Sequence, residues 1–279
     1  GNGTGGKPPA MPTSDDTGLT IETAANRTTD STDTTDNTST SAKALKAGNE
    51  VNISGGEFKI DSADDSVHSN GNIVITGGNI SVASGDNGMH ADGNLTISDG
   101  TVDITKSYEG IEGSIVTIDG GTISVVASDD GINCAGGSDT GSTDRMGADQ
   151  FSSQDGVELN INGGTVTIDA DGDGLDSNGN FTMAGGTVYV CGPTNGGNGA
   201  LDYNGTATVT GGTLIACGAV GMEEGFGDSS TQYSVLHDLG STVSANEKLT
   251  ITDSDGKEIL SFTPVSYTHL RAHETKANL

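Results

Sequence analysis

The sequence has no tryptophan, aromatic residues make up only 4% of its 279 residues, and just 11 basic residues stand against 39 acidic ones. The formal net charge is therefore −28. Nucleic acids and anionic membranes are disfavoured as partners, because the chain offers no basic surface that could displace counterions from phosphates. Divalent cations are the partners that such a charge favours.

Long apolar runs are also missing, and none approaches the ~18 residues that a transmembrane helix needs. The sequence begins at Gly1 rather than at Met, and no signal peptide is visible. We therefore expect a processed or truncated N-terminus, with any export signal or anchor outside this sequence.

Glycine, in contrast, is abundant, with 45 residues and no collagen-like period. This composition is typical either of disorder or of an architecture with many tight turns. Residues 1–48 fit the first description, because they are rich in Ser, Thr, Asp and Gly and hold almost nothing to bury. We predict a disordered linker there, either a spacer behind a surface anchor or an ordinary unstructured terminus.

From residue 51 onward the sequence is a repeat, and each unit contains a pair of corner residues, usually Gly-Gly. The pairs are Gly55-Gly56, Gly77-Gly78, Asp99-Gly100, Gly120-Gly121, Gly163-Gly164, Gly185-Gly186 and Gly211-Gly212. The steps between the first members of successive pairs are 22, 22, 21, 43, 22 and 26 residues. The step of 43 is close to two units, one of which is replaced by an insertion at residues 138–155.

Apolar residues alternate with polar ones on both sides of each corner pair. In the first unit, Val51 and Ile53 precede the pair, and Phe58 and Ile60 follow it. A third inward position comes later in each unit, at Val67, Met89, Ile111, Ile132, Leu175, Leu201 and Met222. Period-2 alternation is typical of short strands with one buried face, and glycine gives the backbone freedom for a sharp corner. Each unit therefore has three sides with inward-facing residues.

A unit of about 22 residues is too short for a strand-helix-strand crossover and fits one coil of a parallel β-solenoid. The sequence therefore predicts an all-β fold, a right-handed parallel β-helix over residues 49–228. A short β segment follows at residues 229–264, with a hairpin formed by residues 249–252 and 258–262. The final residues 265–279 follow no repeat and look like translated cloning or adapter sequence, so functional reasoning excludes them.

Stacking of the coils at ~4.8 Å places equivalent residues of successive units in ladders along the solenoid. The turn ladder is Asp65, Asn87, Glu109, Asp130 and Asp173. The strand ladder, three residues further along each unit, is His68, His90, Glu112, Asn133, Asp176, Asp202 and Glu223. Both ladders flank the third inward residue, so both can present oxygen atoms on one outer edge. Like charges this close repel, so either the pKa values of the carboxyl groups rise or a cation lies between them.

Calcium is the best candidate for that cation, because it accepts about 6 to 8 oxygen ligands in loose geometry. The candidate ligands are Asp64, Asp65, Asp86, Asn87, Glu109, Glu112, Asp129, Asp130, Asp173 and Asp176. Zinc is less favoured, because His68 and His90 are not accompanied by a set of cysteines. The alternative is that these residues only serve the turns, and that a charged edge hinders edge-to-edge aggregation.

The most distinctive stretches of the repeat are ISGGEFKIDSADDSVHSNGNIVITGGNISV, GMHADGNLTIS, SYEGIEG, ASDDGINCAGG and DGDGLDSNGN. They resemble a family of bacterial surface carbohydrate-binding proteins that have a calcium-binding, polysaccharide-lyase-like parallel β-helix. The resemblance runs from about Asn52 to Pro264. It implies an extracellular or cell-surface protein, such as a lipoprotein, that binds calcium and adheres to cellulose and to acidic, pectin-like sugars. The expected partner is an acidic polysaccharide, and the protein is expected to be a monomer.

Three classes of function fit these residues: a carbohydrate-binding protein, a polysaccharide lyase, and a structural adhesin or spacer. A lyase acting on uronates needs a base near the C5 proton and a cation that neutralises the carboxylate. Lys106 is the candidate base, but a solvated lysine paired with Glu109 or Asp103 is the favoured interpretation. We therefore expect a binding protein rather than an enzyme. The candidate carbohydrate-binding residues are Lys106, Tyr108, Glu112 and Asn133.

The sequence contains three cysteines. Cys134 stands alone, whereas Cys191 and Cys217 each follow their corner glycine by six residues and should stack in adjacent coils. Ladder spacing falls within the Cα distances of disulfides. The sequence leaves both a bridge and two free thiols open.

Overall fold

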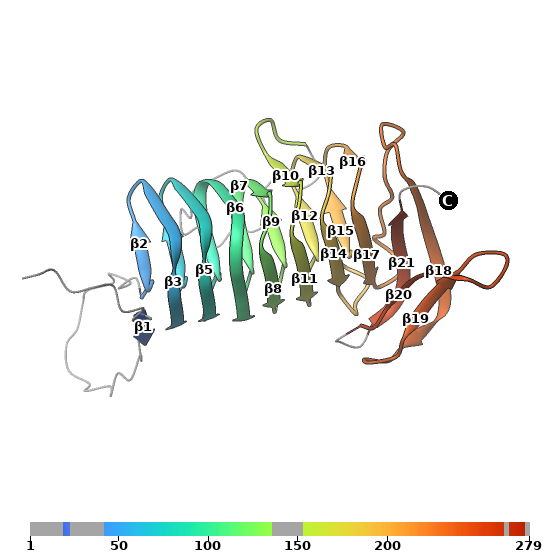
Figure 1. Ribbon diagram of the computed structural model, residues 1–279, viewed down its shortest axis with the longest axis horizontal. Helices are drawn as coiled ribbons and strands as arrows, with labels where there is room; N and C mark the ends of the chain where they lie inside the picture. The colour runs from blue at the N-terminus through green and yellow to red at the C-terminus, as the bar shows by residue number, and fades with distance from the viewer. Residues whose placement is uncertain (1–18, 23–41, 136–152, 265–267, 277–279) are drawn as a thin grey trace, which may run out of the picture.

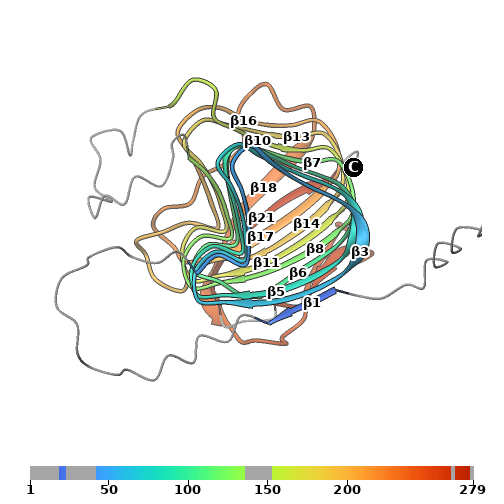
Figure 2. The same cartoon turned by 90° about the vertical axis from the view of Figure 1, so that its left-hand side faces the viewer.

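A computed structural model of the chain describes residues 19–22, 42–135, 153–264 and 268–276. Within these ranges every regular element is a β-strand, and parallel strands stack in about 7 coils of about 22 residues. The coils follow one another along the long axis of the molecule (Figure 1), and they lie over one another when viewed along that axis (Figure 2). The predicted β-solenoid is therefore confirmed. The predicted insertion at 138–155 and the linker at 1–48 lie mostly outside the described residues.

The first side of the solenoid is a stack of parallel strands that precede the glycine corners. Its strands are the first parts of β3 (Glu50–Ser62) and β5 (Asn72–Ser84), the middle of β6 (Met89–Lys106), the end of β7 (Ile111–Ile118), and β10 (Glu158–Ile161), β13 (Asn180–Met183) and β16 (Ala207–Val209). Leu95, for example, lies beside Ile73 of the preceding coil and Val116 of the next. The inward residues of the repeat therefore stack in register.

The second side follows the corners. Its strands are β1 (Leu19–Glu22), the later parts of β3, β5 and β6, and then β8 (Thr122–Ala127), β11 (Thr165–Ala170), β14 (Thr187–Cys191) and β17 (Thr213–Gly218). The third side is formed by β2 (Leu45–Ala47), β4 (Val67–Ser69), the starts of β6 and β7, and then β9 (Ile132–Cys134), β12 (Leu175–Ser177) and β15 (Leu201–Tyr203). Strands β1 and β2 show that the stack begins before residue 49.

The corner between the first and second sides depends on glycine. The second residue of each corner pair has a positive φ, between 78° and 105° in all seven coils, a conformation that glycine adopts without the steric cost of a Cβ atom. Apolar side chains from the three sides fill the interior, and Ile75, Ile111 and Val166 are completely buried. The solenoid thus holds a rigid stack of turns on its outside.

The C-terminal part of the described chain leaves the solenoid. Strand β18 (Tyr233–Val243) pairs antiparallel with β21 (Thr268–Lys276), which also pairs with β17. Strands β19 (Leu249–Thr252) and β20 (Glu258–Phe262) form the predicted hairpin. The described part of the chain offers no helix with the length and apolarity needed to cross a bilayer.

One predicted core residue is wrong. Met222 was expected at the third inward position of the last unit, but its side chain is 42% exposed. The chain departs from the coil after β17, and Gly221 has a φ of 136°, so no third-side strand forms there. Glu223, expected next in the strand ladder, instead accepts a hydrogen bond from the Gly221 amide at 2.6 Å.

Candidate functional site

Both predicted ladders exist along the third side of the solenoid. The strand ladder is in register from coil to coil, in the order Lys46, His68, His90, Glu112, Asn133, Asp176 and Asp202. The turn ladder is held by backbone bonds, since Glu109, Asp130 and Asp173 accept from amides of the preceding coil. We call the side chains of these two ladders, together with Asp64, Asp86 and Asp129, the acidic edge.

The N-terminal end of the acidic edge contains a lysine that the sequence analysis missed. The Lys43 ammonium contacts the Asp65 carboxylate and lies 3.1 Å from Asp64 Oδ1. His68 Nδ1 is 2.8 Å from the same Asp65 oxygen that Lys43 contacts, and Asp65 is completely buried. Asp64, Asp65 and Asp86 also bring carboxylate oxygens within 4.8 Å of one another. In this part of the edge the Lys43 ammonium therefore supplies a positive charge beside the carboxylates of Asp64 and Asp65.

The second histidine lies in the next coil. His90 is stacked on His68 with ring centroids 5.0 Å apart. Its Nδ1 is 2.7 Å from Glu112 Oε2, and its Nε2 is 3.2 Å from Asp92 Oδ1. The Asn87 amide also donates to Glu112. Both nitrogens of His90 thus contact carboxylates. The two imidazoles lie between the Lys43 end of the edge and the coils that carry only carboxylates and amides.

Beyond His90 the edge is dominated by carboxylates. Oxygen atoms of Asp130, Asp173 and Asp176 lie within 4.8 Å of one another. Asp130 Oδ1 accepts a hydrogen bond from the Asp173 amide at 2.7 Å. Asn133 donates to Glu109 Oε1 at 3.3 Å, while its own Oδ1 is buried without a hydrogen-bond donor. We call Glu109, Asp129, Asp130, Asn133, Asp173 and Asp176 the carboxylate cluster.

Asp129 and Asp130 converge over a glycine of the following coil. A Cβ atom at Gly172 would lie 2.5 Å from Asp130 Oδ1 and 2.7 Å from Asp129 Oδ1. A side chain there would therefore occupy the space beside both carboxylates, and glycine is needed for the two to approach this backbone.

Three carboxyl groups of the carboxylate cluster, those of Glu109, Asp173 and Asp176, have raised pKa values. Burial, together with the charges of Glu112 and Asp130, raises the pKa of Glu109 to about 9. Burial and the charges of Asp130 and Asp202 raise the pKa of Asp173 to about 7. Asp176 has its pKa raised well above the ordinary value, again first by burial and then by Asp130. Rising pKa values are one of the two outcomes predicted for stacked carboxylates.

The donor set of the cluster suits a hard divalent cation. Its side chains offer carboxylate oxygens and one amide oxygen that lacks a donor. Calcium prefers such ligands and tolerates irregular geometry. A zinc site of the usual kind would need cysteine or further histidine ligands. The group closest to a zinc site is Asp65, His68 and His90. In this group Asp65 is already bound by His68 Nδ1 and by Lys43.

The remaining predicted carbohydrate-binding residues lie at the same edge. Lys106 ends β6 and is exposed, and it forms no ion pair within the described part of the chain, so the expected pairing with Glu109 or Asp103 is absent. Tyr108 is half-buried, and its amide donates to the Asp86 carbonyl at 2.8 Å. Glu112 and Asn133 are neighbours in the strand ladder.

Sequence reasoning missed Lys43, Lys46 and Asp92. A signal was present for the two lysines, because Lys43 precedes Asp65 by 22 residues and Lys46 precedes His68 by the same step. Asp92 follows the third-side strand and belongs to neither ladder, so only the three-dimensional position of His90 identifies it.

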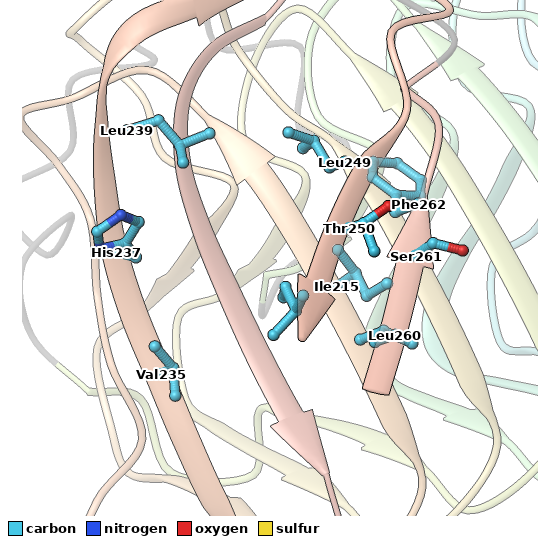
Figure 3. Close-up of a pocket in the computed structure, with 10 residues that line it drawn as sticks. Ile215, Val235, His237, Leu239, Leu249, Thr250, Leu260, Ser261 and Phe262 are labelled. Atoms are coloured by element: carbon cyan, nitrogen blue, oxygen red, sulfur yellow. The ribbon is translucent and has the colours of Figure 1, made fainter. Parts of the chain in front are cut away.

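The three cysteines are buried, and none of them forms a disulfide. Cys191 and Cys217 are register partners in β14 and β17, as predicted. A separate apolar pocket of about 190 Å³ lies between β18 and the β19–β20 hairpin (Figure 3). Leu239, Leu249 and Phe262 are among its lining residues, and no residue of the acidic edge contributes to it.

Comparisons with known proteins fit this architecture. Residues 10–88 and 89–199 match the family described as carbohydrate-binding domain-containing protein. No curated protein and no solved structure gave a match. The family match spans both the coils with the histidines and those with the carboxylate cluster, which places the acidic edge, except Asp202, within the matched region. The chain therefore belongs to the family of carbohydrate-binding domain-containing proteins.

Proposed function

We propose that the protein binds acidic polysaccharides through calcium ions held by the carboxylate cluster. The observation that carries this proposal is the convergence of Asp130, Asp173 and Asp176 within 4.8 Å, in a place where burial and mutual repulsion oppose ionisation. A divalent cation removes that repulsion, because its charge favours the ionised carboxylates.

The sugar supplies the remaining ligands in this proposal. A calcium ion on a protein edge keeps positions for external oxygens, since it takes more ligands than a few carboxylates provide. Uronate carboxylates and sugar hydroxyls match those positions. Without calcium, an acidic polysaccharide meets a chain of net charge −28 and is repelled. Calcium thus makes an acidic glycan and an acidic protein compatible.

Pectin-like sugars are favoured over cellulose as the ligand. Cellulose recognition relies on exposed aromatic platforms, and aromatic residues are only 4% of this chain. Tyr108 is half-buried at the edge, and the Tyr203 hydroxyl contacts the Gly225 carbonyl. An extracellular or cell-surface location fits the proposal, because extracellular calcium sites work at roughly millimolar concentrations.

The test is binding to polygalacturonate by isothermal titration calorimetry, in calcium and then in EGTA. We expect binding only in calcium, and expect the double substitution Asp129→Asn with Asp130→Asn to weaken both calcium and glycan binding at least about tenfold, since hard cations depend on carboxylate charge. Asp99→Asn with Asp119→Asn makes the same charge change on exposed corners and should leave both affinities unchanged. Full binding by the Asp129/Asp130 variant would contradict the proposal.

The same samples separate binding from lyase activity. An unsaturated uronate product in the calcium sample, lost in Lys106→Ala with calcium affinity intact, would assign elimination chemistry to the edge. We expect no such product. If the parent protein binds neither calcium nor polygalacturonate, only a structural role remains for the solenoid.

A further inference from the structure

The acidic edge begins with a cation that belongs to the chain. Counting back one unit of 22 residues from Asp65 gives Lys43, and from His68 gives Lys46. The backbone confirms this register, because Lys46 is the strand partner of His68 and the Ala44 amide donates to the Asp65 carbonyl at 3.1 Å. Lysine thus stands at both ladder positions of the first coil, where later coils carry carboxylate, amide or imidazole groups.

The Lys43 ammonium lies against two carboxylates of this turn. It contacts Asp65, which is completely buried, and it is 3.1 Å from Asp64 Oδ1. Only 11% of the Lys43 side chain is exposed. Backbone amides orient the same carboxylates, since Asp65 donates to Asp64 Oδ1 at 2.9 Å and Asn87 donates to Asp65 Oδ1 at 3.2 Å.

The surrounding groups hold this lysine in its charged form. Burial alone would lower the pKa of Lys43, but hydrogen bonds and attraction from Asp65 and then Asp64 raise it above its ordinary value. Burial acts on Asp64 in the opposite direction, yet hydrogen bonds from Asp65, Lys43 and Ala42 lower its pKa. The turn is therefore a formed cation site with a positive charge already in it.

We propose that Asp64, Asp65 and Asp86 form a divalent-cation site that the chain fills with its own Lys43 ammonium. This inference rests on the proposed function in one respect. If the carboxylate cluster binds calcium, Lys43 marks the end of the acidic edge at which calcium binding stops. The three carboxylates bring oxygens within 4.8 Å of one another, as Asp130, Asp173 and Asp176 also do. The difference between the two sites is the tethered ammonium, which competes with a free ion at a very high local concentration.

The two ends of the acidic edge differ in how their carboxylates are balanced. The first coil has an internal counter-charge in Lys43, so in our proposal it closes without calcium. The coils from Glu109 onward lack the lysine, and in our proposal they recruit a free ion. The N-terminal end thus provides a metal-independent base on which the metal-dependent coils stack.

The experiment removes the ammonium while keeping the length and apolar stem of the side chain. Lys43→Met should bind one more calcium ion per chain than the parent, measured by calorimetry and by luminescence of terbium, which substitutes for calcium. Its melting temperature should fall in EGTA and recover in calcium. Lys59→Met is the matched control, because Lys59 is exposed on the second side of the solenoid, and its calcium stoichiometry should equal that of the parent.

A second substitution locates the added ion. Lys43→Met combined with Asp64→Asn should lose the extra calcium ion and keep those of the parent. If folded Lys43→Met binds no more calcium than the parent, the inference is wrong. If Lys43→Met folds only when calcium is added, the site has accepted the ion and the inference holds, whereas failure to fold in either condition contradicts it.

The outcome for the proposed function can be separated from this one. A parent protein that binds no calcium, beside a Lys43→Met variant that binds one ion, refutes the carboxylate cluster as a metal site and supports the first-coil site. A parent that binds calcium, with no gain in Lys43→Met, supports the cluster and refutes the role of Lys43.

Discussion

At the scale of single residues, Gly172 decides how the carboxylates of the neighbouring coil are arranged. Replacing it by alanine would place a Cβ atom 2.5 Å from Asp130 Oδ1 and 2.7 Å from the Asp129 carbonyl carbon. The backbone must shift and the two carboxylates must turn away. We expect Gly172→Ala to lower calcium affinity about 10- to 100-fold, as changes that misorient metal ligands do, measured by calorimetric titration.

The control for Gly172→Ala must carry similar backbone strain away from the acidic edge. Gly163→Ala does so, because its Cβ atom would lie 2.2 Å from the Asp119 carbonyl oxygen at a glycine corner. Both variants should melt at lower temperature than the parent, and only Gly172→Ala should bind calcium more weakly. Equal calcium affinities in the two variants would show that the glycine serves the turn alone.

At the scale of elements, the turns before the third-side strands make stability depend on pH in an unusual direction. Glu109 and Asp173 have pKa values of about 9 and about 7, above the ordinary 4.5 and 3.8. The folded state therefore binds protons more tightly than the unfolded state. The stabilisation is complete below the ordinary values, declines as pH rises above them, and is gone above about pH 7 for Asp173 and about pH 9 for Glu109.

We expect the calcium-free protein to lose stability from about pH 4.5 to about pH 9, and above about pH 7 the loss comes from Glu109 alone. The urea midpoint in EGTA should fall across this range. Calcium should remove most of the fall, because the ion favours the ionised carboxylates. A calcium-free midpoint that stays constant or rises with pH would show that these carboxyl groups are not coupled to folding.

The elements also show how far sequence reasoning reaches. Corner glycines and alternating apolar residues fixed the three sides and the register of both ladders, since a period of 22 residues leaves little choice of pairing. The prediction that Met222 points inward was wrong, because a sequence repeat does not mark where the chain leaves its last coil. Lys43 was missed because it precedes the first glycine corner, within a stretch whose composition indicates a linker. The convergence of Asp129 and Asp130 on Gly172 depends on the directions of their side chains, which cannot be predicted from the spacing of residues in the sequence.

At the scale of the whole molecule, a net charge of −28 opposes compaction. We expect calcium to raise the melting temperature in scanning calorimetry, with a gain of about 2.7 kcal/mol in unfolding free energy at 100 times the dissociation constant of one site. Sodium chloride at equal ionic strength should give a smaller gain, since it screens charge without occupying the site. Equal gains from both salts would indicate screening alone.

The glycine corner also limits where residues can be inserted into a coil. In all seven coils five positions separate the last inward residue before the corner from the first one after it, as from Ile53 to Phe58 and from Val209 to Leu214. Length varies only at the other two corners: from Val190 to Leu201 in one coil and from Ile132 to Leu159 in another. Foreign loops grafted at those two corners would keep the coils in phase, whereas one added residue at the glycine corner would turn a buried row outward. Added loops are therefore compatible with the coil at these two corners and incompatible with it at the glycine corner.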